Sequence, residues 1–403
     1  MNFKIGYYIG RIGPSSGGIY GYSISLLRYL LSMDEIIEIH LFYLESKDKK
    51  KKIDVESNSK IKFHAIKESK YFFYRENISS FFYSSNLFVG SRILNKLSRI
   101  FNPYKIIDKI AQIENIQLLH VPFQISPLYR VSIPVIITMH DIQELHFPEF
   151  FSPKERLRRS VLYKQAIEDS DHIIVSHNFV KKDIVKYYET AGKKISVADI
   201  GGYVDFKSGS KKETENVISS YKLPDNFILY PAVTWEHKNH INLLNAISLL
   251  NEQGCNYNLV CTGERTSFYK KIENAIKKSG LEKQIFFIGL IPEGHLVELY
   301  RLTRLVVIPS LYEARSGPLL EAMQLTIPVI CSNTTTLPED IGDPAFTFDP
   351  TNVEEMASLI KEGMSNKDFI KRNIENSVRR NTHFSTLDYK QDYLKVYRCV
   401  LEQ

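Results

Sequence analysis

The chain has 403 residues, of which 43% are hydrophobic and 24% are charged, and its formal net charge is +6. This length is typical of about two or three domains with sizeable buried cores. Residues 1–200 carry 29 Lys and Arg against 21 Asp and Glu, so the basic excess belongs to the first half. No zinc-finger spacing, RNP-like aromatic motif or long Lys/Arg run accompanies it, and we therefore expect no nucleic-acid partner.

Cysteine usage and hydropathy indicate where the protein resides. The 4 cysteines form no C-x-x-C pair and no disulfide framework, which indicates a reducing cytoplasm. No apolar run approaches the roughly 18–20 residues that span a bilayer, and MNFKIGYYIG at the N-terminus is typical of a first strand rather than a signal peptide. We expect a cytoplasmic protein, either soluble or peripheral on the inner face of the membrane.

Short apolar runs alternate with amphipathic stretches through the first half of the chain. The expected strands are Lys4–Ile9, Glu38–Tyr43, Leu118–Pro122, Val135–Met139 and His172–Ser176. The expected helices include Tyr22–Ser32, Pro103–Glu114 and Lys154–Glu168. This alternation predicts a parallel α/β domain over residues 1–201.

The same alternation restarts after a polar, charged stretch at residues 201–226, which is typical of a linker and entry helix. The expected strands are Phe227–Val233, Tyr257–Thr262, Ile285–Ile288, Leu305–Pro309 and Val329–Ser332. The helices between them are expected around Ile241–Gln253, Phe268–Ser279 and Gly294–Leu302. A second doubly wound domain over residues 202–385 follows, with a cleft between the two, and ligands in such sheets bind at the carboxyl ends of strands.

Two glutamates frame the start of a helix in residues 304–350, RLVVIPSLYEARSGPLLEAMQLTIPVICSNTTTLPEDIGDPAFTFDP. The helix is expected at Pro318–Leu325, with Glu313 in the loop before it and Glu321 about one turn inside. Ser316 and Gly317 precede the proline, an order that favours a cap and leaves helix N–H groups for a phosphate. Both carboxylates can therefore face one ligand, one holding a sugar and the other a ribose.

At these residues the chain resembles the retaining GT-B glycosyltransferases of family four, or group one transferases, whose signature is two glutamates with seven residues between them. The positions that fit are Ser310, Glu313, Pro318, Glu321, Ala322, Met323, Pro328, Ser332, Leu337, Pro338, Glu339, Gly342 and Asp343. Residues 314–317 read Ala-Arg-Ser-Gly where Gly-Phe-Gly-Leu is common, a departure in the donor-sugar loop. The resemblance implies two Rossmann-like domains facing across a cleft, with a terminal helix in residues 386–403 crossing back to the first domain.

The resemblance also assigns roles at the donor site. Glu313 would hold the donor sugar and Glu321 the ribose, while the amides of Ser316 and Gly317 would contact the phosphates. Gly263 ends a strand, and the segment Ile285–Pro292 is similar to the one that reads the base. Contacts to the nucleoside are therefore expected from Gly263, Leu290 and Ile291, although apolar strand ends of this kind also occur in any α/β core.

Lys238 lies after a strand in FILYPAVTWEHKNHINLL, where a lysine is usually a solvated surface residue. The segment resembles the family's G-R-x-x-x-x-K-N element, in which Arg and Lys clamp the diphosphate. The arginine position falls on Val233, so one cation is missing, and Arg315 or Arg11 can substitute. Charge-assisted donors are the physical requirement, because the leaving diphosphate gains negative charge.

The loop GRIGPSSGGIYG after the first strand does not match G-x-G-x-x-G, which disfavours a dehydrogenase. An ordinary turn before the next helix is one interpretation. The resemblance favours the other, in which Gly17 and Gly18 occupy the family's glycine pair and let the donor diphosphate approach the backbone.

His140 ends an expected strand in TMHDIQELHFPEFFS, where a lone histidine is more often structural. The segment is similar to the family's T-x-H-D stretch, which implies that His140 contacts a sugar hydroxyl or assists the acceptor. His146 is expected to pack or to line the acceptor groove. Asp169 and Asp171 form a D-x-D pair, but their position between a helix and a strand is typical of a turn, so we expect no metal and no cofactor.

An aromatic and basic segment, Lys70–Phe101, is the least family-like part of the chain. It can fold onto the first domain as a loop and helix, or lie at an anionic membrane surface that presents a lipid-linked acceptor.

The resemblance covers nearly the whole chain and implies a metal-independent, retaining hexosyltransferase. Its donor would be a UDP- or GDP-sugar, GDP-mannose included, and its acceptor a glycan or lipid-linked hydroxyl, as in bacterial surface polysaccharide synthesis. Two alternatives stay open: a GT-B epimerase or phosphorylase, and a catalytically silent sugar-binding protein.

Overall fold

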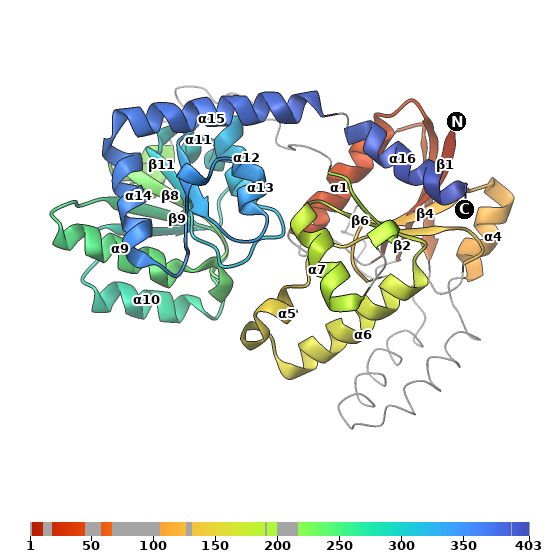
Figure 1. The fold of residues 1–403 in the computed structure, drawn as a ribbon, viewed down its shortest axis with the longest axis horizontal. Helices are drawn as coiled ribbons and strands as arrows, with labels where there is room; N and C mark the ends of the chain where they lie inside the picture. The colour runs from red at the N-terminus through yellow and green to blue at the C-terminus, as the bar shows by residue number, and fades with distance from the viewer. Residues whose placement is uncertain are drawn as a thin grey trace. The chain divides into compact units, whose positions relative to one another are not determined.

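The computed structural model describes residues 2–10, 18–44, 58–66, 105–125, 131–189, 192–199, 217–387 and 389–402. The chain forms two compact units (Figure 1). Unit 1 comprises residues 1–200 together with 388–403, and unit 2 comprises residues 201–387. The aromatic segment Lys70–Phe101 and the glycine-rich residues 11–17 lie outside the described residues.

Unit 1 is built on a seven-stranded sheet in the order β3-β2-β1-β4-β5-β6-β7, and all pairings are parallel. The strands are β1 (Phe3–Gly10), β2 (Ile36–Leu44), β3 (Ile61–Ile66), β4 (Leu118–Val121), β5 (Val135–Thr138), β6 (His172–Val175) and β7 (Ile195–Val197). The five strands expected from the sequence are confirmed within two residues at each end. The edge strands β3 and β7 were not expected, because β3 is partly exposed and β7 has only 3 residues.

The helices of unit 1 lie between these parallel strands along the chain, except for α16, which follows unit 2. They are α1 (Gly18–Leu31), α4 (Lys105–Glu114), α5 (Gln143–His146), α6 (Pro153–Asp169), α7 (Asn178–Tyr188) and α16 (Tyr389–Leu401), with short 3-10 turns η2 (Pro148–Phe150) and η3 (Gly192–Lys194). The start of α6 is set locally, because Ser152 accepts a hydrogen bond from the Glu155 N–H at 3.2 Å and Pro153 occupies the first turn.

The last helix, α16, belongs to unit 1 although 187 residues of unit 2 precede it. Tyr393 and Tyr397 are fully buried, and Tyr397 Oη lies 2.9 Å from His120 Nδ1. Burial lowers the pKa of His120 to about 3, so the ring is neutral and its Nε2 meets Thr138 Oγ1 at 3.0 Å. Tyr393 Oη lies 3.0 Å from Tyr22 Oη of α1. These contacts make α16 part of the core of unit 1.

Unit 2 repeats the plan with a six-stranded parallel sheet in the order β10-β9-β8-β11-β12-β13. The strands are β8 (Phe227–Pro231), β9 (Asn258–Thr262), β10 (Ile285–Gly289), β11 (Leu305–Ile308), β12 (Val329–Ser332) and β13 (Thr347–Phe348). The helices are α9 (His240–Glu252), α10 (Tyr269–Lys278), α11 (Glu293–Leu302), α12 (Gly317–Gln324), α13 (Leu337–Ile341), α14 (Val353–Ser365) and α15 (Lys367–Thr386), with 3-10 turns η4 (Glu236–Lys238) and η5 (Pro344–Phe346). The expected two doubly wound domains are confirmed.

No helix among the described residues is long and apolar enough to cross a bilayer.

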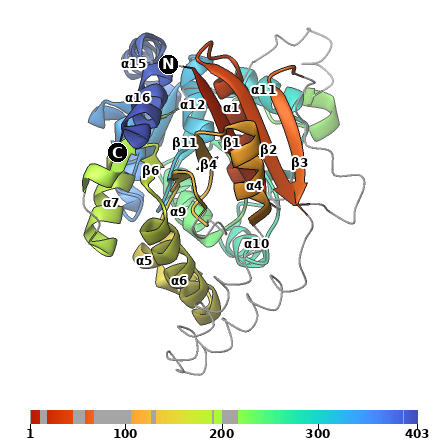
Figure 2. The same cartoon turned by 90° about the vertical axis from the view of Figure 1, so that its right-hand side faces the viewer.

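A charge network lies at the amino-terminal half of β2, where β1, β2 and β3 run side by side near α4 (Figure 2). Glu38 pairs with Lys4 Nζ at 3.0 Å and with Lys62 Nζ at 2.7 Å. The same Lys62 ammonium lies 2.8 Å from Glu114 Oε2. Glu38, His40 and Glu114 offer atoms within 4.8 Å of one another, as metal ligands do. In this network Lys62 already supplies the cation that bridges the two carboxylates.

This network predicts a specific dependence of stability on pH. The hydrogen bond from Lys62 holds the pKa of Glu38 at about 2, below its ordinary value of 4.5. Because the folded-state pKa is the lower one, the network stabilises the fold above pH 4.5 and loses this contribution as the pH falls toward 2. Lys62→Met should therefore lower the free energy of unfolding at neutral pH and weaken its acid dependence, as measured by urea unfolding across pH.

Lys109→Met, an exposed change on α4, serves as the control and should leave the pH dependence unaltered. Parallel curves for wild type and Lys62→Met would show that the network contributes nothing.

Candidate active site

The strand order of unit 2 brings together two loops that are far apart in the sequence. β8 and β11 are neighbours in the sheet, although β9 and β10 lie between them along the chain. The chain leaves β8 after Pro231 and reaches Lys238, and it leaves β11 after Ile308 and reaches Glu313. Because parallel strands end at the same edge, this reversal of strand order is where doubly wound sheets bind ligands.

The backbone around Lys238 is fixed by its neighbours. Asn239 adopts φ 59°, a left-handed conformation that asparagine tolerates better than most residues. Its side-chain amide donates to Pro309 O at 2.9 Å and to Pro350 O at 2.8 Å. The Tyr230 hydroxyl donates to Lys238 O at 2.7 Å. These bonds explain why Asn follows Lys in this loop: it ties the loop to the end of β11.

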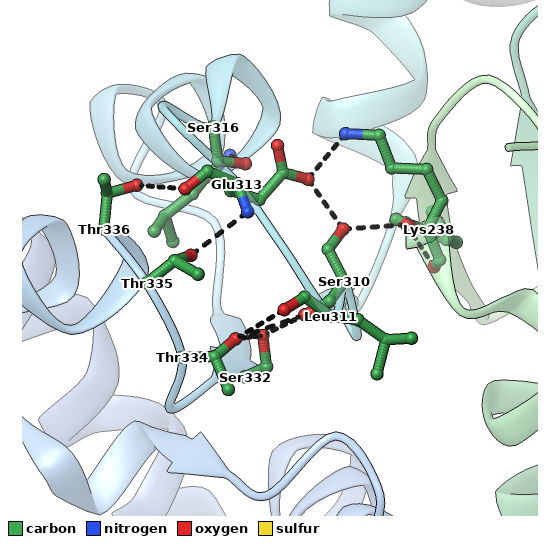
Figure 3. A network of polar contacts seen from close by, with 11 residues as sticks. Lys238, Ser310, Leu311, Glu313, Ser316, Ser332, Thr334, Thr335 and Thr336 are labelled. Atoms are coloured by element: carbon green, nitrogen blue, oxygen red, sulfur yellow. Dashed lines mark hydrogen bonds and ion pairs between the residues drawn. The ribbon is translucent and has the colours of Figure 1, made fainter. Parts of the chain in front are cut away.

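Glu313 is held by one carboxylate oxygen (Figure 3). Its Oε1 accepts hydrogen bonds from Ser310 Oγ at 2.6 Å and from Lys238 Nζ at 2.6 Å. Its backbone is also anchored, because the N–H donates to Thr335 Oγ1 at 3.1 Å and the carbonyl accepts from Thr336 Oγ1 at 3.1 Å. No residue that the structure describes forms a hydrogen bond with Oε2. The carboxylate is therefore oriented and keeps one oxygen for a ligand.

Lys238 supplies the positive charge of its loop. Of the two histidines that accompany it, His240 is buried and His237 is partly buried, and desolvation lowers the pKa of each to about 3. Their rings are neutral near pH 7. Lys238 is consequently the cation of this loop, and it forms a partly buried ion pair with Glu313.

Glu321 lies about one turn inside α12, and the expected cap at the start of this helix is confirmed. Ser316 Oγ accepts from the Leu319 N–H at 3.4 Å, and Pro318 follows Gly317 in the first turn. Glu321 Oε2 accepts a hydrogen bond from the Tyr300 hydroxyl at 2.7 Å. Burial raises the pKa of the Glu321 carboxyl. Gly317 lies against this carboxylate, since a Cβ at that position would stand 3.5 Å from Oε1.

The residues that the sequence predicts to contact the nucleoside lie at the ends of β9 and β10. Gly263 has φ 136°, and a Cβ there would come within 2.5 Å of Ala232 O, so only glycine fits without a shift. Its N–H donates to Gly289 O at 2.9 Å. In the turn that follows β10, Leu290 is 82% exposed and Ile291 is half-buried. Leu290 is thus available to a ligand rather than committed to the core.

Three site residues expected from the sequence, His140, Gly17 and Gly18, belong to unit 1. His140 follows β5, donates from Nε2 to Pro122 O at 3.0 Å, and meets the Tyr22 ring edge-on at 4.6 Å between centroids. Gly18 is the first residue of α1 and is exposed, whereas Gly17 lies outside the described residues.

Two other residues of unit 1 that the sequence analysis considered, His146 and Asp171, make structural contacts. His146 Nε2 pairs with Asp183 Oδ2 at 2.5 Å, so this histidine packs against α7. Asp171 Oδ2 accepts from the Val135 N–H at 2.7 Å and holds the start of β5.

Sequence reasoning missed the residues that hold Glu321 and the Lys238 loop in place. Tyr300 lies on the helix before β11, and Tyr230 lies within β8, where each looks like an ordinary core aromatic. Ser310 was part of the motif but had no assigned role. Val233, at the position of the family's arginine, offers its carbonyl to the Trp235 N–H at 2.8 Å and no cation. Of the proposed substitutes, Arg315 lies in the loop before α12, and Arg11 lies outside the described residues.

Comparison with known proteins decides the family. The profile "Glycosyltransferase Family 4" matches residues 21–201, and "Glycosyl transferases group 1" matches residues 211–380. The chain belongs to the group 1 glycosyltransferases. Together the two profiles cover both units, and the second contains Lys238, Glu313 and Glu321.

Several relatives of this group 1 chain are bacterial mannosyltransferases. O-antigen chain mannosyltransferase B of Escherichia coli is 29% identical over 232 residues, which are 57% of this chain and 61% of the relative. The serotype-specific mannosyltransferase WbdA of the same species is 27% identical over 276 residues, or 64% of this chain and 34% of the relative. The match thus spans less than two thirds of these relatives. O-antigen chain mannosyltransferase RfbU of Salmonella typhimurium is 24% identical over 88% of this chain and 89% of the relative.

Solved structures of low identity confirm the GT-B fold. A glycosyltransferase from Rickettsia africae ESF-5 matches with TM-score 0.67 and 19% identity, covering 100% of this chain and 99% of that one. Anabaena Alr3699/HepE in complex with UDP matches with TM-score 0.68 and 13% identity over 100% of both chains. WaaG, a glycosyltransferase of lipopolysaccharide biosynthesis, gives TM-score 0.62 and 13% identity over 98% and 99%.

The close approach at Gly263 predicts an asymmetric response to two glycine substitutions. Gly263→Ala should lower the free energy of unfolding by about 1–3 kcal/mol, because the methyl group meets the Ala232 carbonyl and φ is strained. Gly294→Ala is the matched control: it lies in α11 with nothing within 4 Å, so it should be neutral or stabilising. Thermal or urea unfolding measures both, and equal stabilities of the two variants would contradict the steric argument.

Proposed function

We propose that this protein is a retaining, metal-independent glycosyltransferase that moves a hexose from a nucleoside-diphosphate sugar to a hydroxyl of a glycan or lipid-linked acceptor. The contact between Lys238 and Glu313 carries the proposal. In such a donor the anomeric carbon is bonded directly to a phosphate oxygen. A site for it must therefore set a cation for the phosphate beside a polar anchor for the sugar, as these two residues do.

The proposed roles follow from charge. As the glycosidic bond breaks, the leaving diphosphate gains negative charge, which Lys238 and the N-terminal amides of α12 can stabilise. The oriented Oε2 of Glu313 can accept a hydrogen bond from a sugar hydroxyl. Retention can proceed by front-face attack, in which the leaving phosphate takes the acceptor proton, and this scheme needs no protein nucleophile. His140 is proposed to contact the sugar or acceptor.

The nucleotide and acceptor are proposed from the relatives. Three mannosyltransferases, two of them named for the O-antigen chain, support GDP-mannose as donor and a bacterial surface polysaccharide as product. A structural neighbour in complex with UDP keeps a UDP-sugar as the competing donor. We place the reaction at the cytoplasmic face of the membrane, where a lipid-linked acceptor is available.

Substitutions of the two glutamates should have different effects on nucleotide binding and on turnover. Glu321→Gln should weaken binding of GDP or UDP by roughly 10- to 100-fold, because the ribose is present in the free nucleotide. Glu313→Gln should keep nucleotide affinity within a few-fold and lower turnover by roughly 100-fold or more, because its proposed contact with the donor is to the transferred sugar, which the free nucleotide lacks. Calorimetry with both nucleotides, beside turnover of GDP-mannose and UDP-glucose, measures these effects and ranks the donors.

Glu273→Gln, an exposed change on α10, is the control and should alter neither quantity. If Glu313→Gln lost nucleotide binding while Glu321→Gln kept it, the roles would be reversed. A wild type that binds nucleotide but never transfers sugar would favour the sugar-binding alternative, and sugar isomers formed without acceptor would favour an epimerase.

Metal independence predicts that transfer survives chelation. Positive charge for the phosphates comes from Lys238, and Asp171 of the D-x-D pair is engaged by the backbone of β5. Activity measured after dialysis against EDTA should stay within about twofold of the untreated enzyme. Loss of activity that manganese or magnesium restores would overturn this part of the proposal.

A further inference from the structure

Tyr300 holds the carboxylate to which the ribose is assigned. Its hydroxyl donates to Glu321 Oε2 at 2.7 Å, from α11 to α12. Among the described residues, no other side chain or backbone group forms a hydrogen bond with this carboxylate. The orientation of Glu321 therefore depends on a single donor.

The tyrosine is suited to this task by its burial. Tyr300 is 0% exposed, and a buried hydroxyl needs a hydrogen-bond partner. Its other acceptor, Pro318 O, lies farther away at 3.4 Å. Burial raises the pKa of Tyr300 well above its ordinary value, so the hydroxyl keeps its proton and remains a donor.

The other carboxylate oxygen faces a place without a side chain. A Cβ at Gly317 would stand 3.5 Å from Glu321 Oε1, so glycine leaves this oxygen open at the start of α12. Glu313 shows the same arrangement with its oxygens exchanged, since Ser310 and Lys238 hold Oε1 and leave Oε2.

We propose that Tyr300 is a positioning residue that fixes Glu321 through Oε2, aims Oε1 at the ribose hydroxyls of the donor, and thereby makes the enzyme prefer ribonucleotides. This inference rests on the proposed function, in which Glu321 contacts the ribose. Without the hydroxyl of Tyr300, the carboxylate can adopt other rotamers and loses the oriented acceptor.

The test compares two ligands that differ only in the hydroxyls at issue. Tyr300→Phe should weaken binding of GDP, or of UDP if UDP binds wild type more tightly, by about tenfold. Binding of the matching 2′,3′-dideoxynucleoside diphosphate should change less than about twofold, because it offers Glu321 nothing to bind. The preference for the ribonucleotide over the dideoxynucleotide, measured by calorimetry, should therefore shrink by about tenfold.

A pH series adds a signature that a purely structural role would not produce. Burial and the nearby Glu293 raise the pKa of Glu321, and the hydrogen bond from Tyr300 opposes them. Phenylalanine removes that opposition, so the folded-state pKa of Glu321 rises further. As the pH is lowered, GDP affinity of the variant should fall at a higher pH than that of wild type.

Tyr221→Phe is the matched control. It removes a tyrosine hydroxyl that lies 2.8 Å from His295 Nδ1, a residue of the same helix α11, and it should leave the ligand preference unchanged. Circular dichroism and unfolding temperature check that each variant is folded. The double variant Tyr300→Phe/Glu321→Gln should bind GDP no more weakly than Glu321→Gln alone.

The outcomes distinguish this inference from the function on which it rests. If Glu321→Gln leaves the ribonucleotide preference intact, the ribose role itself fails. If Glu321→Gln abolishes the preference but Tyr300→Phe does not, Tyr300 is a packing residue and the inference is wrong. Equal weakening of both ligands by Tyr300→Phe would also assign it to packing.

Discussion

The hydrogen-bonded ion pair of Lys238 and Glu313 depends on one topological fact, the adjacency of β8 and β11. Seventy-five residues separate the two side chains in sequence, yet each lies in the loop that follows one of two neighbouring parallel strands. Hydrogen bonds fix the positions of both loops and therefore of the two side chains. Asn239, in the loop after β8, donates to Pro309 O in the loop after β11, and Ser332 Oγ donates to Ser310 O at 2.6 Å. The rest of the site is arranged around this pair.

The two glutamates of the site are oriented in the same way. Each carboxylate is bound by protein donors through one oxygen and keeps the other for a ligand, so its direction is fixed before any ligand arrives. Preorganisation of this kind avoids the cost of ordering a flexible side chain during binding. The donors differ with the task. A lysine and a serine hold Glu313, where the phosphate of the proposed donor would require a cation. A buried tyrosine holds Glu321, where the proposed ribose is neutral and would require none.

Much of this architecture could be predicted from the sequence, since short apolar runs mark the central strands and the S-x-x-E spacing marks the loop that carries Glu313. The cap at Ser316 and the helix after it were also legible, because capping is a local interaction. The role of Tyr300 could not be predicted, because it depends on the contact between α11 and α12. No local sequence pattern distinguishes this tyrosine from a core aromatic residue. The edge strands β3 and β7 were not predicted for another reason: a partly exposed or three-residue strand has too little apolar pattern to detect.

The docking of α16 in unit 1 governs the order in which the molecule can be completed during synthesis. The ribosome releases residues 1–200 first, but the core that they form lacks Tyr393 and Tyr397 until the last helix emerges. Unit 2, by contrast, is continuous in sequence and can finish folding while unit 1 still waits. The polar ring of His120 and the apolar surface around it stay uncovered during that interval, which is when a nascent chain is most exposed to aggregation and to chaperones.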